Sequence, residues 1–155
     1  MAGPEGGEKG VVVAGNYRLE ERLMLHASHC QPGSEMRSYE ALNEVVVGRG
    51  GVFRPVRLQM FVDNELLTTY VADGLIIATP TGSTAYALAA GGPVLPSESQ
   101  SLILIPISPH LSFDRPLVLP PDTVIDIVVR TDHEAVFSID GQTSRCKTAI
   151  VYASV

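Results

Sequence analysis

The sequence predicts a mainly β domain, a layered antiparallel β-sandwich-like fold with one short helix. Three observations support this fold class. About ten short apolar segments are separated by turn residues, a spacing typical of sandwiches. The 155 residues include 14 glycines and 11 prolines, which favour many short elements joined by turns. Hydrophobic residues make up 45% of the chain, enough to bury a core within one domain.

The N-terminal part is predicted to contain a flexible tail at residues 1–15, followed by a single domain at 16–155. The first ten residues, MAGPEGGEKG, lack the apolar centre of a secretory signal. Tyr17–His29 alternates imperfectly between apolar and charged side chains, which indicates a long edge strand. The run EERLML within it would also suit a helix. Gln31–Arg37 is polar and is predicted to be a loop.

A strand is next predicted over Ala41–Val47, interrupted by the polar pair Asn43 and Glu44. This pair has two interpretations. The two side chains are solvated at a strand start or bulge, or they form an amide and carboxylate that hold ribose hydroxyls or a base edge. Gly48–Arg54 is predicted to be a mobile loop.

Two alternating segments, Val56–Val62 and Leu66–Val71, flank Asp63-Asn64 and predict a β-hairpin, because Asp and Asn tolerate the left-handed backbone of a tight turn. Ala72-Asp73-Gly74 predicts a second tight turn into the apolar strand Leu75–Ala78. We therefore expect these strands to pair consecutively in one antiparallel sheet.

The strand is followed by Thr79-Pro80 and by the segment TGSTAY, which predicts a loop and a short helix over Thr84–Ala90. Ser83 or Thr81 is expected to cap this helix, and Gly91-Gly92 to end it. Free amides at a helix start can seat a phosphate, but a capped connector explains the same pattern equally well.

The rest of the chain is predicted to consist of short strands joined by turns, among them a final hairpin around Asp140-Gly141. In order, these strands are Leu102–Ile105, Leu117–Leu119, Thr123–Arg130, Ala135–Ile139, Gln142–Arg145 and Lys147–Tyr152.

Composition excludes several functions. A net charge of −6 argues against nucleic-acid binding, which needs clustered basic residues. The sequence has no apolar run near the ~20 residues of a membrane helix, so we expect no membrane partner. Cys30 and Cys146 give no support for a disulfide, and a cytoplasmic location is expected. His26 and His29 stand near Cys30, but a structural zinc needs four convergent ligands, so no metal site is expected.

Several motifs agree in order and spacing with one family. ALNEVVV, ADGLIIATPTGSTAYALAAGG, PISPHLSFDRPLVLP and SIDGQ together resemble the C-terminal domain of the ATP- or polyphosphate-dependent NAD kinases. The resemblance covers nearly the whole chain from Tyr17. It implies phosphoryl transfer to the 2′-hydroxyl of the adenosine ribose of NAD, with ATP or polyphosphate and Mg²⁺ in the complete enzyme. It also implies a β-rich layered domain and assembly as a homodimer or homotetramer.

The resemblance further implies a set of NAD-binding residues. Asn43 and Glu44 would hold the adenosine portion, with the carboxylate at the ribose hydroxyls and the amide near the base. Asp73 would lie near the nicotinamide end, in a pocket that a neighbouring subunit completes. The adenine and ribose pocket would be lined by Thr81, Thr84, Ala85 and Tyr86, with Ser83 nearby.

One departure from the family is large, because the sequence contains no Gly-Gly-Asp-Gly-Thr motif. The aspartate of that motif is the expected catalytic base in the family, so we expect no catalytic residue in this chain. Smaller departures are Ala72 where Gly is frequent and Ala87 where many members have Asn. The alternatives are a stand-alone, non-catalytic nucleotide-binding or assembly module, and a relative of the lipid kinases. The combination of TGSTAY with Asn-Glu points away from the lipid kinases.

Overall fold

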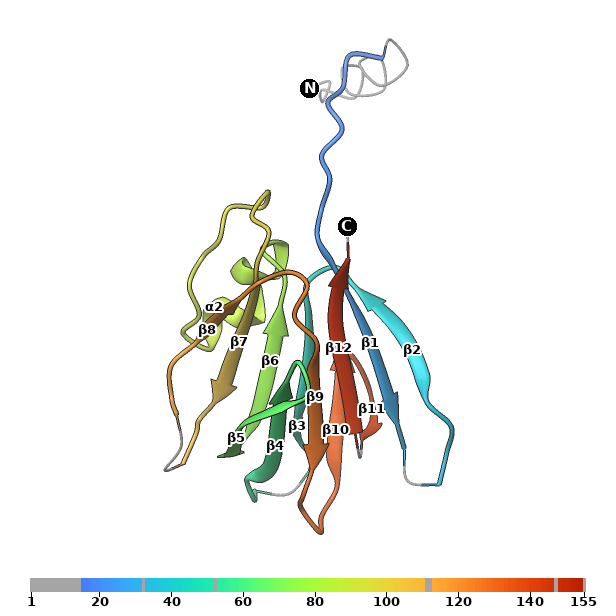
Figure 1. Cartoon of the computed structure of the whole chain (residues 1–155), viewed down its shortest axis with the longest axis vertical. Coiled ribbons are helices and arrows are strands. Elements are labelled where there is room, and N and C mark those ends of the chain that lie inside the picture. Colours follow the sequence, from blue (N-terminus) through green and yellow to red (C-terminus); the bar gives the residue numbers. More distant parts are fainter. Residues whose placement is uncertain (1–14, 32, 52, 111–112, 147, 155) are drawn as a thin grey trace, which may run out of the picture.

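Two antiparallel sheets pack face to face in the computed structural model, which describes residues 15–31, 33–51, 53–110, 113–146 and 148–154 (Figure 1). The first sheet contains, in spatial order, β2 (Arg37–Ala41), β1 (Met24–Cys30), β12 (Thr148–Ser154), β9 (Ile125–Val129), β4 (Val56–Val62) and β5 (Glu65–Ala72). The second contains β11 (Gln142–Cys146), β10 (Ala135–Ile139), β3 (Glu44–Arg49), β6 (Gly74–Ala78), β7 (Leu102–Ile107) and β8 (Leu117–Leu119). The predicted layered β fold is confirmed.

The main core lies between the two sheets and is built from alternate residues of their strands. Leu25, Leu58 and Ile127 from the first sheet belong to one buried cluster with Val45 and Phe137 from the second. The strands that border this core alternate between buried and more exposed positions, as strands with one buried face do.

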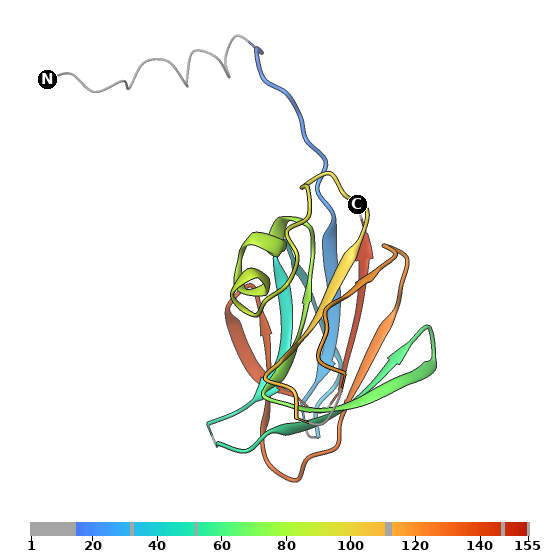
Figure 2. The ribbon, with the colours of Figure 1, turned by 90° about the vertical axis from the view of Figure 1, so that its left-hand side faces the viewer.

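Strand β6 differs because all five of its residues are buried, which means that both faces are covered. Leu75 and Ile77 belong to the core between the sheets, whereas Ile76 and Ala78 pack in a second cluster with Ala87. Ala87 lies in α2 (Tyr86–Ala89), which covers the outer face of the second sheet beside η1 (Thr81–Thr84), as Figure 2 shows. This helical cover positions the site described below.

Both predicted tight-turn hairpins are confirmed. Asp63 and Asn64 have φ values of 51° and 68°, and Asp140 and Gly141 have 42° and 86°. These left-handed conformations are the ones that two-residue hairpin turns require. Gly91, with φ of 84°, follows the helical segment and confirms the predicted stop.

The expectation that consecutive strands pair around Asp73 is wrong. β5 lies at the edge of the first sheet, and β6 lies in the second sheet between β3 and β7. Ala72-Asp73-Gly74 is therefore a crossing between sheets and not a hairpin. The physical reason is burial, because a strand that is apolar on both faces is stable only with a cover on each side.

The predicted long edge strand Tyr17–His29 is also wrong in length and position. β1 begins only at Met24, extends to Cys30, and lies between β2 and β12 inside the sheet. Residues 15–23 form an extended segment outside any strand, here called the arm, which leads away from the body of the molecule in Figure 1.

The polar loop expected up to Arg37 is shorter than predicted, because Arg37 already begins β2. The strand expected over Ala41–Val47 is two strands, since Ala41 ends β2, residues 42 and 43 bend, and Glu44 begins β3 in the other sheet. Of the expected N-terminal tail, residues 1–14 lie outside the described residues and only Gly15 lies within them. Lys147, the first residue of the last predicted strand, lies outside them as well.

The single helix expected over Thr84–Ala90 is divided into two short pieces. η1 and α2 are separated by Ala85, whose φ and ψ of −96° and −128° are not helical. Neither piece has a side-chain cap, so the caps expected from Thr81 or Ser83 are wrong. The hydroxyl of Ser83 instead donates to the carbonyl of Pro80 at 2.7 Å and accepts from the amide of Leu95 at 3.1 Å.

Candidate functional site

An open groove of about 480 Å³ runs along the outer face of the second sheet beside α2. Its size lies within the range of small-molecule sites. A second groove of about 380 Å³ shares Arg49, Phe53 and Asp73 with it and adds His110. The larger groove is lined by Val46, Gly48, Arg49, Gly50, Gly51, Phe53, Asp73, Tyr86 and Ile107.

Glu44 and Tyr86 lie together near one end of this face. Antiparallel register pairs Glu44 with Ala78, which places the carboxylate where β6 leads into the TGSTAY segment. The backbone N–H of Tyr86 donates toward this carboxylate. The Oε2 atom of Glu44 is buried and has no hydrogen-bond partner among the described residues. The side chain of Tyr86 is 46% exposed and lines the groove.

The pKa of Glu44 is raised above its ordinary value, mainly by burial and also by the negative charge of Asp140. The Tyr86 N–H opposes this shift because it stabilises the charged form. A half-buried carboxylate with one unsatisfied oxygen is an acceptor that a ligand hydroxyl could satisfy.

Asn43 and Glu44 lie at the bend between β2 and β3, here called the Asn43 corner. Two residues that sequence reasoning did not identify as site residues hold this corner through hydrogen bonds. The carboxylate of Asp140 accepts hydrogen bonds from the amides of Leu42, Asn43 and Glu44 at 2.8, 3.0 and 3.0 Å. The buried hydroxyl of Thr79 donates to the Leu42 carbonyl at 2.5 Å and accepts from the Gly82 amide at 3.0 Å.

The available sequence signals for these residues were ambiguous. Thr79 stands between a buried strand and a proline, where a hydroxyl often closes a turn. Asp140 stands in an Asp-Gly hairpin turn, and the turn alone explained the aspartate. Only the fold brings each of them to the Asn43 corner.

Gly82 lies directly against the backbone of Asn43. A Cβ atom at this position would come within 2.5 Å of the Asn43 carbonyl carbon and 2.8 Å of its Cα. The close approach requires glycine, because any side chain would push the turn away from the corner.

The remaining residues of the TGSTAY segment have different surroundings. Ser83 is fully buried, and its hydroxyl bonds are internal. Thr84 and Ala85 are exposed, and the Thr84 hydroxyl donates to the Thr81 carbonyl at 3.4 Å. Thr81 is half-buried and faces the arm, where Arg22 donates to its hydroxyl at 3.3 Å. The fold therefore gives Ser83 a place in the support of the turn rather than on the groove.

Asp73 lies at the opposite end of β6 from Thr79, about 20 Å away by strand geometry. Its carboxylate is 3.2 Å from the Nε of Arg49, and its carbonyl accepts from the Arg49 amide at 2.9 Å. The Arg49 guanidinium lies 5.3 Å from the centre of the Phe53 ring. Asp73 and Tyr86 line the same groove, so the site is elongated.

Two further findings concern metals and membranes. Within the described ranges, no group of three or more His, Cys, Asp or Glu residues could hold a metal ion. None of the helices found in those ranges has the length and apolar character needed to span a bilayer.

Comparisons with known proteins agree on one family. The sequence profile of the ATP-NAD kinase C-terminal domain matches residues 42–152. The NAD kinase of Heliobacterium modesticaldum is 49% identical over 132 residues, which cover 84% of this chain and 47% of that protein. The NAD kinase of Moorella thermoacetica is 44% identical, with 84% and 42% covered. The chain therefore spans about half the length of the curated relatives it matches.

Solved structures show the same similarity. The crystal structure of yeast NADH kinase complexed with NADH has a TM-score of 0.87 at 31% identity and is matched over 95% of this chain and 44% of its own. The structure of an NAD kinase from Archaeoglobus fulgidus in complex with ATP has a TM-score of 0.79 at 27% identity, with 95% and 56% covered.

Proposed function

The chain belongs to the NAD kinase family, and from this we propose that it supplies the NAD-binding half of an enzyme that phosphorylates NAD. The reaction transfers a phosphoryl group from ATP or polyphosphate to the 2′-hydroxyl of the adenosine ribose and gives NADP. The relatives above bear the NAD kinase name, and the two solved structures hold NADH and ATP. The stand-alone module and the lipid-kinase relative gain no support from these comparisons.

The observation that carries the proposal is the buried Oε2 of Glu44, which lies beside Tyr86 and has no hydrogen-bond partner within the described ranges. Ribose hydroxyls donate hydrogen bonds and a carboxylate accepts them, so this oxygen suits the adenosine ribose. Asn43 on the same corner would contact the base. Asp73, at the far end of the elongated groove, suits the nicotinamide end of the same ligand.

The TGSTAY segment completes the adenosine part of this proposed site. Thr81, Thr84 and Ala85 would line the adenine and ribose pocket, and the exposed ring of Tyr86 offers an apolar surface to the base. Ser83 would act indirectly, because its buried hydroxyl fixes the turn to Leu95.

Phosphoryl transfer also needs a base near the 2′-hydroxyl and a cation to neutralise the donor phosphates. The proposal assigns neither to this chain. The sequence lacks the Gly-Gly-Asp-Gly-Thr motif, and its described part contains no metal-binding group of three or more His, Cys, Asp or Glu residues. The role proposed for this chain is to bind NAD and to orient its ribose.

We also propose an assembly state and a location for this chain. Each sheet ends in two edge strands, β2 and β5 in one and β8 and β11 in the other. Such edges can pair with a second copy, which supports a homodimer or homotetramer. The proposed location is the cytoplasm, where the NAD pool and a nucleotide donor are both present.

Calorimetric titration of the purified chain with NAD tests the proposed function. We expect the wild-type chain to bind NAD and Glu44→Gln to weaken binding by about 10- to 100-fold, because hydrogen bonds to charged groups contribute about 1.5–3 kcal/mol. Glu65→Gln, an exposed carboxylate at the start of β5, is the matched control and should bind as wild type does.

Equal NAD affinity in the wild type and in Glu44→Gln would disprove the role of Glu44. The same chain, supplied with ATP and Mg²⁺, should form little NADP. Turnover at an ordinary kinase rate would show that the missing motif is not essential.

A further inference from the structure

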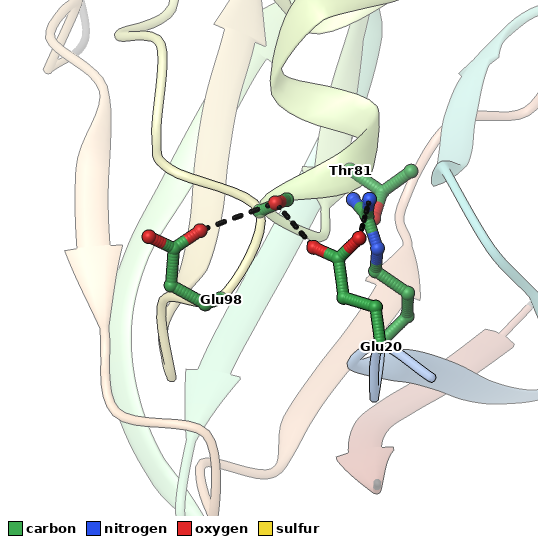
Figure 3. A network of polar contacts seen from close by, with 5 residues as sticks. Glu20, Thr81 and Glu98 are labelled. Atoms are coloured by element: carbon green, nitrogen blue, oxygen red, sulfur yellow. Dashed lines mark hydrogen bonds and ion pairs between the residues drawn. The ribbon is translucent and has the colours of Figure 1, made fainter. Parts of the chain in front are cut away.

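A network of polar contacts joins the arm to the turn after β6, as Figure 3 shows. The guanidinium of Arg22 donates through Nη1 to the Thr81 hydroxyl at 3.3 Å and through Nη2 to the Glu20 carboxylate at 2.8 Å. The Ser97 hydroxyl donates to the other oxygen of Glu20 at 2.8 Å and lies 3.2 Å from an oxygen of Glu98. Arg22 and Glu20 of the arm therefore link the turn at Thr81 to the segment that contains Ser97 and Glu98.

The direction of these hydrogen bonds is fixed by chemistry. A guanidinium can only donate, so the oxygen of Thr81 must accept from Arg22. The hydroxyl hydrogen of Thr81 is then directed away from Arg22 and is available to be donated to another acceptor. Without Arg22, the same hydroxyl could accept from or donate to water in several orientations.

Glu20 holds the guanidinium in place. Hydrogen bonds from Ser97 and Arg22 lower the pKa of Glu20 below its ordinary value, so the carboxylate is charged at neutral pH. One carboxylate oxygen of Glu20 accepts from Arg22 on the arm, and the other accepts from Ser97 in the connection after α2. This arrangement orients Arg22 toward Thr81.

The network contributes little to overall stability. The side chains of Arg22 and Glu20 are 35% and 49% exposed, and ion pairs at such positions contribute at most about 1 kcal/mol. The turn itself is already fastened by Thr79 and Ser83. The remaining consequence of the network is the orientation of the Thr81 side chain.

We infer that Arg22 is a positioning residue of the nucleotide site, which makes the Thr81 hydroxyl a hydrogen-bond donor toward the ligand. The acceptor on the ligand would be a ribose oxygen or a ring nitrogen of the adenine nucleotide. This inference rests on the proposed function, because the nucleotide is the ligand that the function assigns to the turn.

A double-mutant cycle on NAD affinity tests the inference. Arg22→Met and Thr81→Val should each weaken NAD binding by about 2- to 10-fold, the net effect of one hydrogen bond. The double variant should bind no more weakly than Thr81→Val, because Arg22 acts through Thr81. Arg22→Lys, which keeps a donor, should recover part of the loss.

Arg18→Met is the matched control, since it removes the same charge from the same arm. Arg18 lines a groove formed by the arm and Glu98, and the control should bind NAD within twofold of wild type. Additive losses in the double variant, an equal loss in Arg18→Met, or no loss in Arg22→Met would each overturn the inference.

A ligand-free measurement separates this inference from the proposed function. Three-bond NMR couplings to the Thr81 methyl group should report one χ1 rotamer in the wild type and in Arg18→Met, and averaged rotamers in Arg22→Met. Failure of the wild type to bind NAD would disprove the proposed function. Unchanged couplings in Arg22→Met would disprove the positioning role, whatever the NAD titration shows.

Discussion

At the scale of single residues, Glu44 shows how position makes an ordinary side chain a candidate site residue. In sequence the simpler interpretation of Glu44 is a solvated residue at a strand start, and it does begin β3. The structure adds what the sequence could not show, namely a buried oxygen without a hydrogen-bond partner in the described part of the chain, and the nearby N–H of Tyr86. Burial, rather than residue type, is therefore the observation that supports the ligand-binding interpretation proposed for Glu44.

The raised pKa of Glu44 predicts a pH-dependent stability. An acid whose pKa is higher in the folded state binds its proton more tightly there, so its contribution to stability is lost as pH rises from 4.5 through the folded-state pKa. Glu44→Gln should therefore make the ligand-free chain more stable at pH 7, by up to about 1 kcal/mol after solvent screening.

Urea unfolding of the wild type and of Glu44→Gln between pH 4 and pH 8 measures this effect. The difference between the two curves should shrink as pH falls through 4.5, because the carboxyl then becomes protonated in the unfolded chain as well. A difference that stayed constant across the range would contradict the titration of Glu44 as its cause.

At the scale of elements, the shape of the candidate site depends on how closely η1 packs on the corner between β2 and β3. Three residues set that distance: Thr79 through its hydroxyl, Asp140 through its carboxylate, and Gly82 through its lack of a side chain. Helix propensity has little part in it, because η1 and α2 have only four residues each.

Gly82→Ala is predicted to destabilise the chain by about 1–3 kcal/mol, because the added Cβ would overlap the backbone of Asn43. It should also weaken NAD binding by moving the turn away from Glu44. Gly51→Ala is the matched control, since nothing lies within 4 Å of its added Cβ. In urea unfolding, the midpoint should fall more in Gly82→Ala than in Gly51→Ala. An equal fall in both variants would contradict overlap with Asn43 as the cause.

At the scale of the whole molecule, His29 joins the two sheets. Its ring is 1% exposed and stacks 4.3 Å from the ring of Phe137 in the second sheet and 5.6 Å from that of Tyr39 in its own. Its Nε2 lies 2.9 Å from the Ser144 hydroxyl of β11. Burial, and to a lesser extent the charge of Arg37, lower the pKa of His29.

The lowered pKa predicts that the domain loses stability in mild acid. The unfolded chain binds the proton of His29 more tightly, so stability falls as pH drops from 6.5 toward the folded-state pKa. His29→Phe, which cannot titrate, should remove this part of the pH dependence. The control is His26→Gln, a histidine on the same strand that faces Glu40 and is partly exposed.

Urea midpoints measured from pH 7.5 to pH 5 decide this prediction. The wild type and His26→Gln should lose stability over this range more steeply than His29→Phe does. An equally steep loss in His29→Phe would assign the acid sensitivity to other groups.

The sequence by itself determined the β-rich class, the two Asp-containing hairpin turns, the glycine stop after the short helix and the motifs of the family. These features are local, because turn chemistry and the alternation of apolar residues act over a few neighbouring positions. Strand existence was therefore predicted well, and the residues of the candidate site could be named from their motifs.

Only the tertiary structure decided how those pieces meet. It places β6 between β3 and β7 in the second sheet. It also brings Asp140 to Leu42, 98 residues apart in sequence, and Arg22 to Thr81, 59 residues apart. Such contacts depend on which faces are buried and on loop closure between distant segments, which no local pattern encodes. The unsatisfied oxygen of Glu44 is a product of that assembly, and with it the acceptor on which the proposed NAD site depends.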